Sequence, residues 1–270
     1  MTRSPRHSIA RWVWGKHIAA SLLGVRALLR RLERAYGAQH WWPADSAFEI
    51  VIGAVLVQRT TWANAEAAIG RLRRRDLLHC EALASAELPV LESCVRTAGF
   101  YRSKAARLRA IARYFRDLGG VGALLTLRTP ALQESLLKLP GIGRETADAI
   151  ALYAYDRPVW VVDAYSQRVL GRMSGRSWKR HDELAYVAPL VRARAVGALK
   201  ELHALLVEHG KQRCKSRPLC ADCVLQRRCS YAADAQLSEL TRRAPREPTP
   251  RARGPRARGL RDRTGFRGTS

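Results

Sequence analysis

Four cysteines place the tightest constraint on how this chain can fold. They lie within sixteen residues with the spacing Cys214-x5-Cys220-x2-Cys223-x5-Cys229. Such spacing lets one short loop turn all four sulfurs toward a single centre, either a tetrahedral zinc ion or a [4Fe–4S] cluster. Zinc modules usually carry two short knuckles, whereas this chain has one short pair between two longer gaps, which favours the cubane. We therefore expect a cluster-binding loop over residues 214–229.

Most of the remaining chain has the hydrophobic pattern of helices. In 21–36, apolar residues recur at the spacing of a helical stripe, and the alternation typical of strands is nearly absent along the sequence. Further helices are predicted at 47–57, 63–75, 105–118, 130–137, 144–155, 162–173 and 198–209, the last of them ending with Gly210 as its C-cap. We expect an all-α domain over 21–230.

Positive charge is in large excess. Lys and Arg number 48 against 23 Asp and Glu, a net charge of +25. Nucleic acid is the first partner that such a surface suggests, although an anionic membrane surface or an arginine-rich composition would also account for it. Residues 1–20 are predicted to be a basic flexible N-terminus. Residues 231–270 are predicted to be a basic disordered tail that either attracts phosphates or has no role.

Neither a membrane span nor a secretion signal is apparent in the sequence. No run of about eighteen apolar residues occurs, and the basic N-terminal region lacks the pattern of a signal peptide. We expect a monomer in the reducing cytoplasm, bound to DNA and to no membrane. Six cysteines in such a compartment are more consistent with metal ligands than with disulfides.

A short turn with two glycines precedes a predicted helix at 139–147, Leu-Pro-Gly-Ile-Gly-Arg-Glu-Thr-Ala. The glycines allow backbone N–H groups to approach an anion closely, and the helix start adds partial positive charge. We expect Gly141, Gly143 and Arg144 to bind a DNA phosphate, directly or through a monovalent cation held by the hairpin carbonyls. The motif alone leaves open a plain helix–helix turn without a ligand.

Together these motifs resemble the endonuclease III, or helix-hairpin-helix-GPD, superfamily of DNA glycosylases. Residues 139–147 resemble the family's hairpin, and Asp163, eighteen residues beyond Glu145, resembles its aspartate. The cysteines follow in the family's order, with a shorter first gap than in endonuclease III. The resemblance covers about residues 25–230. It implies two helical subdomains, a C-terminal [4Fe–4S] loop and a role in base excision repair.

The resemblance also implies DNA contacts outside the hairpin. Gln58 lies in a segment similar to the one that carries the family's wedge glutamine, which fills the gap left by a flipped-out base. Phe100 stands where the family places a second wedge, and Lys104 belongs to the same loop–helix segment. We expect all three residues to contact DNA.

Glu145 is the departure from the family with the largest consequence. Bifunctional members carry a lysine here that forms a Schiff base with the sugar, which a carboxylate cannot do. Asp163 would stabilise the oxocarbenium-like sugar and orient or deprotonate the attacking water. We therefore expect a monofunctional glycosylase with Asp163 and Glu145 as its catalytic residues. Each also has a plain helical role, Glu145 as a first-turn acid and Asp163 as an N-cap.

Tryptophans supply a candidate base pocket. The segment 41–43 (Trp-Trp-Pro) and Trp62 resemble the 3-methyladenine DNA glycosylases of the endonuclease III type, in which two aromatic rings sandwich the alkylated base. Cationic purines stack well on indole faces. Core packing explains Trp42 and Trp62 about equally well, so both interpretations stay open.

Three functions compete. The first is a monofunctional glycosylase that releases alkylated purines from double-stranded DNA. The second is a bifunctional glycosylase/AP lyase acting on oxidised pyrimidines, with Lys211 or Lys138 as the replacement amine. The third is a non-catalytic iron–sulfur protein that binds DNA and senses damage or redox state.

Overall fold

The computed structural model describes residues 23–235, and all regular secondary structure in that range is helical. The predicted all-α class is confirmed. The helices are α2 (Val25–Tyr36), α3 (Ala47–Leu56), α4 (Trp62–Arg73), α5 (Cys80–Ser85), α6 (Leu88–Val95), α7 (Tyr101–Asp117), α8 (Thr129–Leu137), α9 (Arg144–Tyr153), α10 (Ala164–Ser174), α11 (Arg180–Arg192) and α12 (Val196–Gln212). Short 3-10 turns are η1 (Arg96–Ala98), η2 (Val121–Thr126) and η3 (Gln226–Arg228). None of the helices within 23–235 combines the length and apolar character that crossing a membrane requires.

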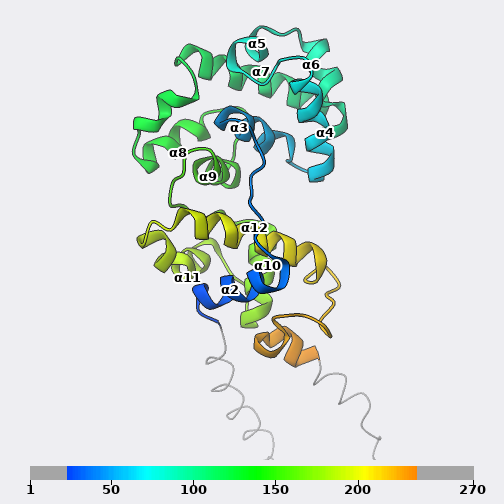
Figure 1. Ribbon diagram of the computed structural model, residues 1–270, viewed down its shortest axis with the longest axis vertical. Helices are drawn as coiled ribbons and strands as arrows, with labels where there is room; N and C mark the ends of the chain where they lie inside the picture. Colours follow the sequence, from blue (N-terminus) through cyan, green and yellow to red (C-terminus); the bar gives the residue numbers. More distant parts are fainter. Residues whose placement is uncertain (1–22, 236–270) are drawn as a thin grey trace, which may run out of the picture.

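The helices form two halves, one above the other in Figure 1, and each half has its own apolar core. The upper half contains α3 to α9, with Phe115 among its largest buried side chains. The lower half contains α2 and α10 to α12, with Trp160 at its centre. The chain starts in the lower half, where α2 packs on α12, crosses to the upper half through residues 37–46 and returns after α9. The two predicted helical subdomains are therefore confirmed.

Helix α9 holds the two halves together. Its last residues, Leu152 and Tyr153, are buried in the lower core, while its earlier apolar residues belong to the upper core. Its Asp148 is fully buried, accepts a hydrogen bond from Gln133 of α8 at 2.6 Å and pairs with Arg180 of α11 at 2.6 Å. Because a buried carboxylate without partners is costly, these bonds fix α9 against elements of both halves.

Three helices were missing from the sequence prediction. Helix α5 has six residues and α6 has eight, and α6 carries a proline in its first turn. Neither helix is long enough to show a clear hydrophobic period in the sequence. Helix α11 contains Pro189, which removes one backbone donor and weakens the helical pattern. These three helices are stabilised chiefly by tertiary contacts, α5 and α6 on α7, and α11 on α12 and α2.

The predicted C-cap at Gly210 is wrong, since α12 continues through it to Gln212. A Cβ atom at Gly210 would lie 2.5 Å from the ring of Tyr165 on α10. The glycine therefore allows α10 and α12 to pack closely, and it does not end the helix.

Most of the two predicted terminal segments, 1–20 and 231–270, lies outside the described residues. The exception is 231–235, which continues a helical turn that begins at 230 and buries Ala232. The folded part of the chain thus extends past the predicted boundary at residue 230.

Candidate active site and DNA-binding surface

Asp163 begins helix α10, and its two carboxylate oxygens have different partners. Oδ1 accepts the N–H of Ser166 at 2.7 Å, and the Ser166 hydroxyl accepts the N–H of Asp163 at 3.1 Å, which completes a capping box. Oδ2 lies 3.5 Å from Nε2 of His203 on α12. The predicted N-cap role is confirmed, and the second oxygen is not needed for it.

The surroundings of Asp163 favour its ionised form. Burial would raise the pKa of this carboxyl group, but the interactions with His203 and Ser166 outweigh burial and lower the pKa. A carboxylate that stays charged at neutral pH can stabilise a developing positive charge on a sugar.

Glu145 lies in the first turn of α9, and its pKa shifts in the opposite direction. Partial burial and the negative charge of Asp163 raise the pKa of Glu145, and His203 partly opposes this. These electrostatic interactions place Glu145, Asp163 and His203 in one site. The site lies between the halves, where α9 approaches the start of α10 and α12 (Figure 1).

His203 was not predicted as a partner of Asp163. Its side chain is buried, with Nδ1 2.8 Å from the hydroxyl of Tyr153 and Nε2 facing Asp163. In the sequence it is one of two histidines on an amphipathic helix, forty residues after Asp163. No local pattern connects the two residues, because only the packing of α12 beside α10 brings them together.

The two candidate pocket tryptophans contact each other edge to face. The ring centroids of Trp42 and Trp62 are 5.4 Å apart with an interplanar angle of 85°, and Trp42 also meets Tyr153 edge to face at 5.6 Å. Nε1 of Trp42 is buried and has no hydrogen-bond partner in the described part of the chain. In this arrangement the rings pack between the cores and do not form two parallel walls around a base.

The predicted hairpin connects α8 to α9 and exposes its glycines. Gly141 has a φ of +79°, a left-handed conformation that favours glycine, and a Cβ there would lie 2.7 Å from the side chain of Arg107. Leu139 and Ile142 are buried and anchor the turn. No side chain caps α9, so the first N–H groups of the helix have no side-chain acceptor and can serve an external anion.

The two candidate wedge residues have different environments. Nε2 of Gln58 donates to the carbonyl oxygen of Gly141 at 2.9 Å and to the hydroxyl of Thr146 at 3.0 Å, so this side chain rests on the hairpin. Phe100 precedes α7 with a left-handed φ of 46°, and its side chain is 63% exposed. An exposed aromatic ring on a strained backbone position is typical of a contact residue.

Lys104, which was predicted to contact DNA, has a buried ammonium group in this structure. Its Nζ donates to the carbonyl oxygens of Leu56, Gln58 and Ala98 at 2.9, 2.8 and 2.7 Å. These three bonds connect the turn after α3, which carries Gln58, to the turn before α7, which carries Phe100. Lys104 therefore holds the two candidate wedges relative to each other.

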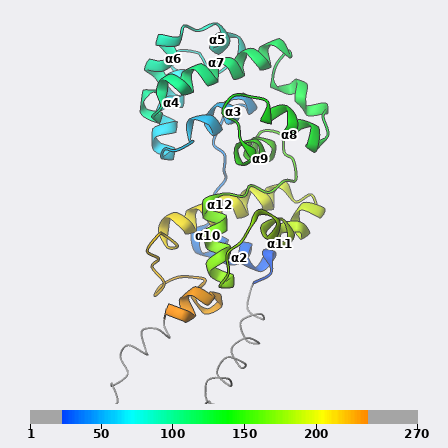
Figure 2. The same ribbon diagram turned by 180° about the vertical axis from the view of Figure 1, so that it is seen from behind.

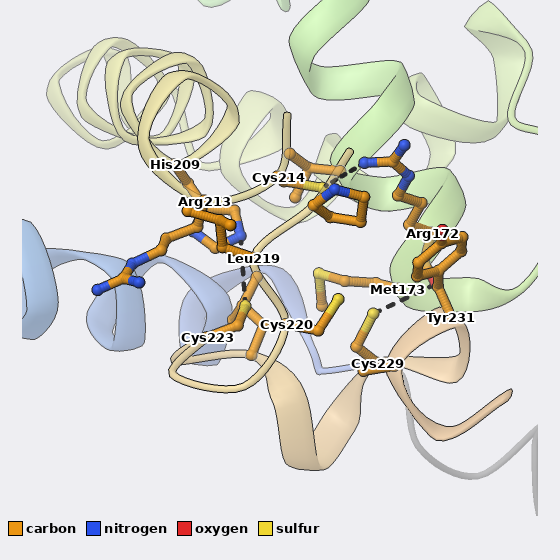
Figure 3. A pocket seen from close by; sticks show the side chains of 14 residues that line it. Arg172, Met173, His209, Arg213, Cys214, Leu219, Cys220, Cys223, Cys229 and Tyr231 are labelled. Carbon is orange, nitrogen blue, oxygen red and sulfur yellow. Dashed lines mark hydrogen bonds between the residues drawn. The ribbon is translucent and has the colours of Figure 1, made fainter. Parts of the chain in front are cut away.

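The four cysteines of the loop line one cavity in the lower half, on the side away from the upper half (Figure 2). Figure 3 shows the four sulfurs turned toward the same space, a cavity of about 20 Å³. All four thiols are free of disulfides, and Arg172 donates to Sγ of Cys214 at 3.4 Å.

The chemistry of the cysteine cavity fits a thiolate-bound metal group. Among the described residues, no three His, Cys, Asp or Glu side chains converge tightly enough to hold a single metal ion. Four thiols that face one cavity match the ligand set of a [4Fe–4S] cluster.

Comparison with known proteins agrees with this architecture. Residues 52–188 match the family described as "HhH-GPD superfamily base excision DNA repair protein". The chain is 38% identical over 198 residues to a protein of Methanocaldococcus jannaschii named for a DNA repair glycosylase, which spans 72% of this chain and 90% of that protein. It is 28% identical over 208 residues to endonuclease III of Thermotoga maritima, which spans 77% and 92%.

A solved structure shares the fold. The Helicobacter pylori 3-methyladenine DNA glycosylase, bound to 1,N6-ethenoadenine, matches with a TM-score of 0.60 and 27% identity over 70% of this chain and 98% of that chain. The hairpin and Asp163 both lie inside the range matched by the family. This chain is thus a DNA glycosylase of the endonuclease III type, and it belongs to the HhH-GPD superfamily of base excision DNA repair proteins.

Proposed function

We propose that this glycosylase is monofunctional and hydrolyses the glycosidic bond of alkylated purines in double-stranded DNA. The observation that carries the proposal is the carboxylate pair of Asp163 and Glu145 at the boundary between the halves. Glu145 occupies the position at which bifunctional relatives carry the lysine nucleophile. A carboxylate cannot form a Schiff base, so water becomes the nucleophile.

The two carboxylates suit different tasks. Asp163, held by Ser166 and His203 and kept ionised, would face the sugar and stabilise its positive charge as the base leaves. Glu145, with its raised pKa, is the stronger base and would accept a proton from the attacking water. Active sites in which two carboxylic acids have different roles typically hold them in environments that separate their pKa values.

DNA would be held from the hairpin side. Gly141, Gly143 and Arg144 would bind a phosphate, and Gln58 and Phe100 would fill the gap left by the flipped base. To enter the duplex, Gln58 has to leave the carbonyl oxygen of Gly141. That carbonyl would then be free for the monovalent cation proposed at the hairpin.

Alkylated purines are proposed as substrates because of the aromatic side chains near the site. Trp42 and Trp62 would have to separate for a base to stack between them, since they now meet edge to face. The buried, unpartnered N–H of Trp42 would then offer a hydrogen bond in the same region. The Helicobacter pylori relative is bound to 1,N6-ethenoadenine, itself a modified purine.

The cysteine loop is proposed to hold a [4Fe–4S] cluster through Cys214, Cys220, Cys223 and Cys229. Arg172 and Arg213 line the same cavity and would offset the negative charge of a thiolate-bound cluster. The bound cluster would supply a cross-link within the loop. We expect the purified protein to be brown and to contain iron and sulfide. A colourless protein that contains zinc would contradict this assignment.

The proposed reaction can be tested with a panel of duplexes that contain an alkylated purine, an oxidised pyrimidine or uracil. We expect free base from the alkylated purine and no covalent enzyme–DNA adduct after borohydride reduction. A strong adduct together with a preference for oxidised pyrimidines would favour the bifunctional alternative. Binding without base release from any duplex would favour the non-catalytic alternative.

A further inference from the structure

We infer that His203 is a positioning residue for Asp163, a buried side chain that holds this carboxylate in place and keeps it charged. The inference rests on the proposed function, because it assigns His203 a part in hydrolysis at Asp163. His203 would not touch the substrate and would act through the carboxylate alone.

The imidazole ring of His203 has one fixed orientation. Its side chain is 6% exposed, and it is enclosed by the rings of Trp41, Tyr153 and Trp160, with centroid distances of 6.1, 5.7 and 6.1 Å. The rings of Trp41 and Trp160 make interplanar angles of 76° and 90° with the imidazole ring. Nδ1 therefore points to the Tyr153 hydroxyl and Nε2 to Oδ2 of Asp163.

The two ring nitrogens of His203 face different groups. Nδ1 lies 2.8 Å from the hydroxyl of Tyr153, which also lies 3.1 Å from the carbonyl oxygen of Lys200. Within the described residues, Nε2 has no hydrogen-bond partner, and it lies 3.5 Å from Oδ2 of Asp163. A proton on Nε2 therefore faces Asp163.

Titratable groups approach His203 from three neighbouring helices. Asp163 approaches from the start of α10, Glu145 and Tyr153 from α9, and Glu183 from α11. On α12 itself, Lys200 and Glu201 interact with Tyr153. Three of these groups are carboxylates, and of these Asp163 lies 3.5 Å from Nε2.

Loss of the His203 side chain has a consequence for Asp163 that can be measured. Burial raises the pKa of Asp163, and the interactions with His203 are the largest of those that lower it. Without His203, Asp163 would therefore take up a proton at a higher pH. A protonated carboxyl group has no negative charge with which to stabilise a cationic sugar.

The test compares the binding of two duplexes that carry a sugar mimic in place of the damaged nucleotide. One mimic is a positively charged pyrrolidine ring, and the other is a neutral tetrahydrofuran ring. The ratio of their dissociation constants reports the negative charge at Asp163 and requires no knowledge of the damaged base. We expect the wild-type protein to prefer the charged mimic by about tenfold, or 1.4 kcal/mol, at both pH 6 and pH 8.

The key variant is His203→Gln, which keeps an N–H donor but cannot become charged. We expect it to prefer the charged mimic at pH 8 and to lose most of that preference at pH 6. His181→Gln makes the same exchange at a 76% exposed side chain and should leave the ratio unchanged. Asp163→Asn should abolish the preference at both pH values, which validates the readout.

The inference is overturned if folded His203→Gln keeps the wild-type ratio at pH 6. Circular dichroism and a melting curve establish that the variant is folded. Should it not fold, Tyr153→Phe carries the test, because it removes the hydroxyl that orients His203 through Nδ1 and should also weaken the preference at pH 6; an unchanged ratio would then overturn the inference. A normal ratio in a protein that releases no base from any duplex would contradict the proposed function and leave this inference intact.

Discussion

Helices α9 and α10 both begin at the boundary between the halves, and their first turns are built in opposite ways. Helix α9 starts at Gly143 without a side-chain cap, whereas α10 starts at Asp163, whose carboxylate forms a capping box with Ser166. An uncapped start leaves N–H groups for an external anion, while a capped start uses them internally. The same element can therefore serve as a phosphate site or as the support of a catalytic carboxylate.

The two carboxylates at these helix starts differ in a similar way. The pKa of Asp163 is lowered because His203 and Ser166 lie close to its carboxylate, whereas burial and the charge of Asp163 raise the pKa of Glu145. Both side chains are acids near the start of a helix, so the helix dipole does not explain the difference. The specific neighbours of each carboxylate do: Ser166 follows Asp163 on the same helix, and His203 comes from α12.

The largest expected effect follows from removing the charge of the capped carboxylate. Asp163→Asn keeps an oxygen for the N–H of Ser166, because asparagine is a good N-cap. We expect single-turnover base release to fall by about 10³-fold, with little change in melting temperature. Asp163→Ala should lose the cap as well, at a cost of about 1 kcal/mol in stability. Normal base release by Asp163→Asn would mean that Asp163 only caps helix α10 and takes no part in the reaction.

Position 145 should decide between hydrolysis and lyase chemistry. Glu145→Lys places an amine beside Asp163, where it can attack the sugar and form a Schiff base. We expect borohydride trapping on damaged DNA to rise by about tenfold or more over the wild type. Glu145→Arg is the matched control, because it has the same charge but is not a nucleophile. An equally strong adduct with the wild type would show that another amine, such as Lys211, performs the reaction.

The uncapped start of α9 should be sensitive to a side chain in its hairpin. Gly141→Ala would force a left-handed φ on alanine and push its Cβ against Arg107, so stability should fall by about 1 kcal/mol. Binding to damaged and undamaged duplexes should weaken equally, by roughly tenfold, because a phosphate contact does not read sequence.

Gly175→Ala is the matched control for the hairpin variant. Gly175 also has a left-handed φ, of +71°, but it ends α10 beside Ser230. It should lose a similar amount of stability and bind DNA normally in an anisotropy titration. Equal loss of DNA binding in both variants would show that the hairpin is not the phosphate site.

The smallest expected effect concerns the stability contributed by Glu145. Because its pKa is raised in the folded protein, ionisation of Glu145 disfavours the folded state above its ordinary pKa of about 4.3. Glu145→Gln should therefore raise the melting temperature at pH 7 by at most about 2 °C. The gain should vanish well below pH 4, where the glutamate is protonated in both states. A lower melting temperature at pH 7 would mean that Glu145 stabilises the fold as a charged first-turn residue.

The sequence predicted those parts of the molecule that depend on local patterns. Apolar periodicity and turn residues predicted α3 and α9 to within two residues at each end. Side chains whose partners are remote could not be assigned in this way. Lys104 was expected to contact DNA because its segment resembles the family's loop–helix segment, and no local pattern predicts that the carbonyls of residues 56, 58 and 98 enclose its ammonium group. His203 was left without a role because its carboxylate partner lies forty residues earlier, on another helix.

Hydrolysis at Asp163 without cleavage of the DNA strand is tested most directly by one time course. A duplex with a single alkylated purine is incubated with excess enzyme, and free base and cleaved strand are measured in the same samples. With the wild type, we expect free base to accumulate while the strand stays intact until alkali is added, and Asp163→Asn should yield neither product. Strand cleavage that keeps pace with base release, or base release that survives in Asp163→Asn, would contradict the mechanism.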